Sequence, residues 1–120
     1  MTVQLRLNQH LMKWDEIINA FRTAVHNQAV SEARYKHDRA VFIAEQRASD
    51  PKLSQSAAET LADADPVLND ARIARLGSDA EVEAFKQKLI WCRSQADALR
   101  SEVASERANA ALYADHPGAA

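Results

Sequence analysis

The chain of 120 residues is poor in the residues that build tight turns, disulfides and aromatic cores. It has two glycines, three prolines and one cysteine, and aromatic residues make up only 6%. So few glycines exclude the glycine-rich loops that hold phosphates in nucleotide-binding enzymes, and a single cysteine excludes an internal disulfide. The longest apolar run, residues 40–44, is far shorter than the roughly 20 residues of a membrane helix. Because the first residues also lack the apolar stretch of a signal peptide, we expect a cytoplasmic protein with no membrane partner.

The side chains needed for catalysis or metal binding are few and poorly spaced. The histidines, His10, His26, His37 and His116, contain no pair with the close spacing of a helical metal site. Cys92 falls on an apolar helix face, where it is explained as a small buried hydrophobe. No nucleophile, base and orienting group occur together. We therefore expect a protein that is not an enzyme and that has no catalytic residues, metal or cofactor.

Helix-forming residues dominate what is present. The sequence is 47% hydrophobic and 27% charged, and alanine, the best helix former, supplies much of the apolar share. Alanine buries little surface, so long helices that meet along narrow seams suit this composition better than a thick globular core. A seam that one chain does not cover would be covered by another copy.

The first half predicts one long helix over residues 8–49. Apolar residues recur three or four positions apart through its first part, and no proline or glycine interrupts it. Asn8 is suited to cap its start, and Pro51 ends it because proline disfavours a helical conformation in the residue before it. Residues 1–7 alternate apolar and polar side chains, which indicates either a short strand that needs a partner or a tail.

Residues 50–65 are predicted to connect the two halves. Ser56 and Glu59 have the spacing of a capping box, so the connector admits a short helix over residues 57–63. The connector is acidic, whereas the excess of basic residues lies in the first helix and the turn after it.

A second long helix is predicted over residues 66–114. Asp65 followed by Pro66 is a strong start signal, because aspartate caps the free N–H groups and proline suits the first helical position. Gly77 lies inside this helix at a cost of about 1 kcal/mol; we favour a continuous helix over a break at this residue. Residues 115–120 contain proline and glycine and are predicted to be a tail.

The second helix also carries a heptad repeat of apolar residues. A repeat of 3.5 residues is the condition for a supercoiled helix–helix seam, which we interpret as an oligomer seam. The predicted class is therefore all-α, with two long helices, heptad-type seams and oligomeric assembly, as a hairpin or as splayed helices that pair with other copies. The residues of this predicted seam, called the heptad seam below, are Val82, Phe85, Leu89, Cys92, Ala96, Leu99 and Val103.

The late part of the first helix is basic and contains a tyrosine. Cations beside an aromatic ring suit single-stranded nucleic acid, because charge follows the phosphates and rings stack on bases. The alternative is a solvated helix face with the tyrosine in a seam between helices. The candidate nucleic-acid-binding residues are Arg34, Tyr35, Lys36, Arg39, Arg47 and Lys52.

A second set of basic residues lies on a series of positions spaced by seven along the second helix, in which Asp79 occupies the one position that is not basic. On a supercoiled helix such residues share one face, which would attract a phosphate backbone. The alternative is an ion-paired face, because acidic residues lie close enough to pair with it. This basic stripe comprises Arg72, Lys86, Arg93, Arg100 and Arg107.

Trp91 lies directly beside the heptad seam. A tryptophan just outside a two-helix seam indicates a wider interface. It is equally compatible with a core residue, because Leu89 and Ile90 broaden the apolar face at this point.

Three short segments of the second half, ADPVL (64–68), LIWC (89–92) and DALRS (97–101), resemble the bacteriophage recombination mediators typified by UvsY. The likeness covers residues 64–101, with a looser parallel over 33–47. It implies a homo-oligomer, such as a ring, in the cytoplasm of an infected host. Such a protein binds single-stranded DNA, helps to displace the single-strand DNA-binding protein and loads a recombinase.

The resemblance also carries over a pair of basic DNA-binding residues separated by one position, which fall on Arg34 and Lys36, close to Arg39. The net charge of −2 departs from what DNA binding favours. Two alternatives stay open: a helical structural or adaptor protein of a virion or other assembly without DNA binding, and a small helical inhibitor or escort of a host protein.

Overall fold

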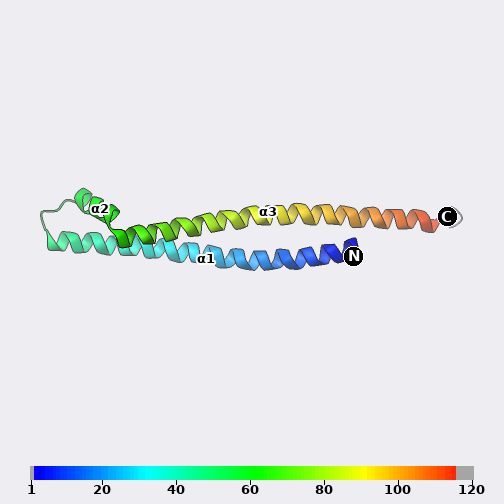
Figure 1. Ribbon diagram of the computed structural model, residues 1–120, viewed down its shortest axis with the longest axis horizontal. Helices are drawn as coiled ribbons and strands as arrows, with labels where there is room; N and C mark the ends of the chain where they lie inside the picture. Colours follow the sequence, from blue (N-terminus) through cyan, green and yellow to red (C-terminus); the bar gives the residue numbers. More distant parts are fainter. Residues whose placement is uncertain (1, 116–120) are drawn as a thin grey trace. The chain divides into compact units, whose positions relative to one another are not determined.

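The computed structural model describes residues 2–115 and contains three helices, α1 (Val3–Ser49), α2 (Gln55–Ala64) and α3 (Pro66–Asp115) (Figure 1). The described residues include no strand, which confirms the predicted all-α class with two long helices. Within this range, none of the helices has a stretch both long enough and apolar enough to span a bilayer. The predicted tail at 115–120 lies outside the described residues except for Asp115, which ends α3.

Helix α1 begins at Val3, ahead of the predicted Asn8, and this corrects the strand or tail expected over residues 1–7. The hydroxyl oxygen of Thr2 accepts a hydrogen bond of 3.1 Å from a backbone N–H of the first turn, as capping residues do. Val3 and Leu7 are both buried. Because residues four apart lie on the same helix face, the apparent alternation was part of a helical pattern.

Helix α2 is longer than the predicted 57–63 and begins earlier. The hydroxyl oxygen of Ser54 accepts a hydrogen bond of 3.0 Å from the backbone N–H of Ala57. Ser56 therefore does not cap the helix as predicted: it lies inside it, where its carbonyl accepts a hydrogen bond from the hydroxyl of Thr60. The turn that precedes α2 is closed by a hydrogen bond of 3.0 Å from the backbone N–H of Leu53 to the carbonyl of Asp50.

The start of α3 is formed as predicted. A carboxylate oxygen of Asp65 accepts a hydrogen bond of 3.0 Å from the backbone N–H of Leu68, and Pro66 is the first helical residue. This satisfies one of the N–H groups that a helix start leaves without a partner. The helix then continues through Gly77 without a break.

Replacing Gly77 with alanine should stabilise the protein. A Cβ atom built at Gly77 meets no other heavy atom within 4 Å, and alanine is favoured over glycine in a helix by about 1 kcal/mol. We expect Gly77→Ala to raise the free energy of unfolding by about that amount, measured by urea denaturation. Ala80→Gly, at an exposed position of the same helix, is the matched control and should lower it. A lower stability for Gly77→Ala would contradict a continuous α3.

The described residues fall into two compact units. The first, Phe21–Ala84, is called the connector unit because it contains the link between the two long helices. The second combines Met1–Ala20 with Phe85–Ala120 and is called the terminal unit.

The core of the connector unit joins α2 to parts of α1 and α3. Ile43 of α1 and Leu68 of α3 are 8% and 5% exposed, and two alanines of α2 are at most 2% exposed. The small alanines let α2 approach the other helices closely. The cluster consists of Ile43, Ala58, Ala62 and Leu68, with Phe42 and Leu53 packed against it.

Polar contacts show the relative direction of the two long helices within the connector unit. The amide of Gln28 donates a hydrogen bond of 2.9 Å to Asp79, and the guanidinium of Arg75 lies 5.4 Å from the ring centre of Tyr35. Later residues of α1 therefore contact earlier residues of α3, so this part of the two helices is antiparallel.

The terminal unit pairs its two helical segments in the same antiparallel sense. Arg6 forms an ion pair of 2.9 Å with Glu102, and the Nε2 atom of His10 donates a hydrogen bond of 2.8 Å to the carbonyl of Cys92. Cys92 and Ala96 are completely buried within the single chain. A second copy is not needed to explain their burial, and their role between subunits stays a prediction.

Candidate functional site

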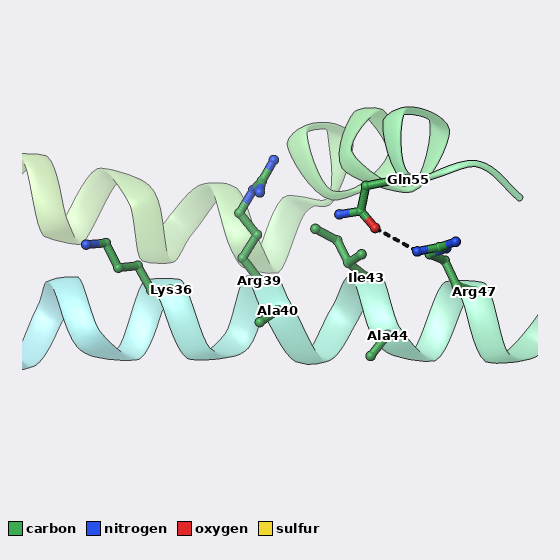
Figure 2. A pocket seen from close by; sticks show the side chains of 7 residues that line it. All are labelled: Lys36, Arg39, Ala40, Ile43, Ala44, Arg47 and Gln55. Atoms are coloured by element: carbon green, nitrogen blue, oxygen red, sulfur yellow. Dashed lines mark hydrogen bonds between the residues drawn. The ribbon is translucent and has the colours of Figure 1, made fainter.

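An open groove of about 500 Å³ lies between α1 and the start of α2 in the connector unit (Figure 2). Three of its side chains, Lys36, Arg39 and Arg47, carry positive charge, and all three were predicted to bind nucleic acid. Small or apolar residues of α1 separate them. The groove, called the basic groove below, is lined by Lys36, Arg39, Ala40, Ile43, Ala44, Arg47 and Gln55.

Helical spacing brings these cations together. Lys36, Arg39, Ile43 and Arg47 follow one another at intervals of three or four residues, which places them on the same face of α1. At 1.5 Å per residue, the cations extend over about 16 Å of the helix. Ile43 is buried in the core with α2, so the packing of α2 holds this face in place.

Arg47 contacts a neutral side chain in the groove. Its Nη1 atom donates a hydrogen bond of 2.9 Å to the side-chain oxygen of Gln55, the first residue of α2 (Figure 2). Because Gln55 is neutral, this contact orients the guanidinium without neutralising it. The other N–H groups of the planar guanidinium remain suited to a phosphate.

The other two cations pair with carboxylates outside the groove lining. Lys36 lies 3.0 Å from Glu32, and Arg39 lies 3.3 Å from Asp63. Apart from Arg39, which is 30% exposed, these side chains are about half exposed or more. Exposed pairs of this kind contribute about 0–1 kcal/mol, so an incoming anion can compete for both cations.

The remaining predicted residues of this segment lie outside the basic groove. Arg34 is exposed but precedes Lys36 by two positions, which turns it about 200° around the helix. Tyr35 is half-buried beneath the guanidinium of Arg75. It therefore lies in the seam between the helices, which was the alternative to nucleic-acid binding for this residue. Lys52 lies in the turn after α1, where its backbone N–H donates to Asp50.

The basic stripe is exposed along α3. In the connector unit, Arg72 donates a hydrogen bond of 3.0 Å to Asn69. In the terminal unit, Arg100 lies 3.5 Å from Asp97, whereas Arg93 and Arg107 make no ion pair with any residue that the structure describes. The stripe is therefore partly paired.

Sequence reasoning missed the neutral part of the basic groove. The spacing of Ala40, Ile43 and Ala44 relative to Lys36 is visible in the sequence and could have indicated an apolar floor between cations. Gln55 could not have been found in this way, because it comes from another helix.

Within residues 2–115, no group of three or more His, Cys, Asp or Glu side chains is placed to hold a metal ion. Comparisons with protein-family models, with curated proteins and with solved structures find no match to the chain.

Proposed function

We propose that this protein binds single-stranded DNA in the basic groove and works as an oligomeric recombination mediator. The observation that carries the DNA-binding part is the groove itself, in which Lys36, Arg39 and Arg47 surround an apolar floor and no carboxylate belongs to the lining. A groove of cations that follows the phosphate backbone is one of the two usual elements of sequence-independent single-strand binding. The other element, aromatic side chains on which bases stack, is not part of this lining.

Because the net charge is −2, attraction of DNA has to come from the basic groove and not from the chain as a whole. The chain has no general positive charge to draw in DNA, so affinity depends on the few cations that are gathered in one place. A single groove with three cations binds weakly. An oligomer presents several grooves to one strand, which raises the effective concentration for each further contact.

The mediator part of the proposal rests on the resemblance of the segments at 64–68, 89–92 and 97–101 to the UvsY-type proteins. It adds the homo-oligomer, with the heptad seam as its predicted surface, and the recombinase and single-strand DNA-binding protein as partners. These roles follow from the resemblance alone.

Light scattering on the size-excluded protein, with and without a fluorescent oligo-dT strand, tests this proposal. We expect a discrete oligomer that elutes with the strand at low salt and releases it at high salt. If three phosphates are neutralised per chain, the logarithm of the affinity should fall with the logarithm of the salt concentration with a slope of about −2. An oligomer that ignores the strand would contradict DNA binding.

A structural or adaptor protein without DNA binding is the second candidate. In the connector unit, α3 exposes three large apolar side chains, Val67, Ile73 and Leu76, with exposures of 75%, 57% and 50%. Ile73 and Leu76, three positions apart, share one helix face, and contiguous exposed apolar patches are found at protein interaction sites. An assembly of fixed mass that forms without any strand affinity would favour this candidate.

A further inference from the structure

Trp91 is exposed on the terminal unit, although tryptophan is among the costliest side chains to leave in water. Its side chain belongs to α3 and is 58% exposed. The residue lies outside the basic groove, which belongs to the connector unit. Neither the core nor the proposed phosphate contacts account for it.

Aromatic contacts between the two helical segments of the terminal unit hold Trp91 in place. The ring of His10 meets it edge-on, with centroids 5.8 Å apart and an interplanar angle of 75°. The Nε2 atom of His10 bonds the carbonyl of Cys92 at 2.8 Å, and because a carbonyl only accepts, this nitrogen carries the proton. The ring centres of Trp14 and His10 are 6.4 Å apart. His10 is thus a positioning residue that holds the indole, which stays 58% exposed.

A small groove of about 220 Å³ adjoins the indole. Its α1 wall presents Arg6 and Lys13, which are seven positions apart and so lie on the same helix face. Arg6 is paired with Glu102 at 2.9 Å, but both side chains are about half exposed, so the pair is weak. The lining consists of Arg6, Gln9, His10, Lys13, Ile17, Trp91 and Cys92, with no carboxylate.

The surroundings of Trp91 on its own helix are also free of acids. The positions three and four residues away, which flank it on the helix surface, are Gln87, Lys88, Ser94 and Gln95. An open indole within a neutral or basic neighbourhood matches a ligand that has both a flat ring and a negative charge. A nucleotide of a polynucleotide strand has both, because its base stacks on the indole while its phosphate meets a cation.

A second copy of this chain is a poorer match to the same surface. The chain has 15 basic and 17 acidic residues, mixed along both long helices, so a copy docked here would bring residues of both signs towards Arg6 and Lys13. A nucleic acid strand carries one sign of charge throughout.

We infer that Trp91, with Lys13 and Arg6 beside it, is a base-stacking site for single-stranded nucleic acid, separate from the basic groove. The inference rests on the proposed function, since it concerns the same class of ligand. It adds recognition of the bases to the phosphate contacts of the basic groove, through residues that lie outside the candidate nucleic-acid-binding segment.

Tryptophan fluorescence of the full-length chain tests this inference. In a Trp14→Phe chain, Trp91 is the only tryptophan, so its emission reports directly on the site. We expect unlabelled oligo-dT to quench this emission, whereas an abasic strand with the same phosphates should bind more weakly and quench little. Strand binding itself is measured separately, by the anisotropy of a labelled oligo-dT.

Substitutions measure how much the stacking contact contributes to the affinity for the strand. Stacking of one base is worth about 5- to 150-fold in affinity, so Trp91→Ala should weaken strand binding within that range, and Trp91→Phe should restore most of it. Lys13→Ala should lower the salt slope by about 1. Ile90→Ala is the matched control, because Ile90 is 61% exposed on the same turn, and it should bind the strand as the wild type does.

The outcomes separate this inference from the proposed function. A rise in anisotropy without quenching, or a Trp91→Ala chain with wild-type affinity, would overturn the stacking site and leave DNA binding in place. No rise in anisotropy with either strand would overturn both. Emission of Trp91 that changes with protein concentration before any strand is added would show instead that another copy covers this surface.

Discussion

A chain with Lys36, Arg39 and Arg47 all replaced by alanine should lose about 100-fold in affinity for oligo-dT at 0.1 M salt. Three phosphate contacts give a salt slope of about −2, so lowering the salt from 1 M to 0.1 M strengthens binding about 100-fold. The variant would lose this gain. The magnitude of the salt slope should decrease by about 2, the share of three phosphate contacts. Anisotropy titrations at several salt concentrations measure both quantities, and circular dichroism checks that the helices persist.

The matched control removes the same three charges from elsewhere. Arg22, Arg34 and Arg107 are exposed and lie outside the groove lining, so replacing all three with alanine leaves the groove intact. We expect this control chain to keep most of its affinity. Equal losses in the two chains would show that overall charge, or the predicted positions Arg34 and Arg107 outside the groove, govern binding as much as the groove does, and would overturn the assignment of the groove.

Replacing Ala96 with aspartate should destabilise the protein by about 3 kcal/mol or more, the range reached when an unpaired charge is buried. Ala96 is completely buried in the terminal unit, so the new carboxylate would start out away from water. Urea denaturation followed by circular dichroism measures the change, which is a large part of the stability of an ordinary domain.

Ala98→Asp is the control for this substitution. Ala98 lies on the same helix, two positions further on, and is exposed. The substitution introduces the same side chain with the same helix propensity, but its carboxylate stays in water. We therefore expect the free energy of unfolding to change by no more than about 0.5 kcal/mol. If the two variants were equally stable, the antiparallel pairing of the terminal unit would be wrong.

Local signals predicted the helices well where each signal has its own physical cause. Asp65 and Pro66 start α3 as expected, because a cap and a fixed backbone angle act on the residues next to them. Pro51 likewise lies just beyond the end of α1. The prediction failed at residues 3–7, where the pattern was too short to distinguish a period of two from a period of 3.6.

The candidate site was predicted only in part, for a reason of geometry. The candidate segment contained Lys36, Arg39 and Arg47, but it also contained Arg34, which the helix turns to another side. Nearness in sequence was taken for nearness in space, although residues two apart on a helix do not share a face.

The sequence by itself determined that the chain is helical, where its long helices begin and end to within a few residues, and which residues of α3 are apolar. These properties depend on backbone propensity, caps and periodicity, which act over a few positions. Only the tertiary structure decided that α2 packs on Ile43, that Gln55 meets Arg47, and that His10 holds an exposed Trp91. Each of these contacts joins residues of two helices, and nothing in the local sequence states which helix faces will meet.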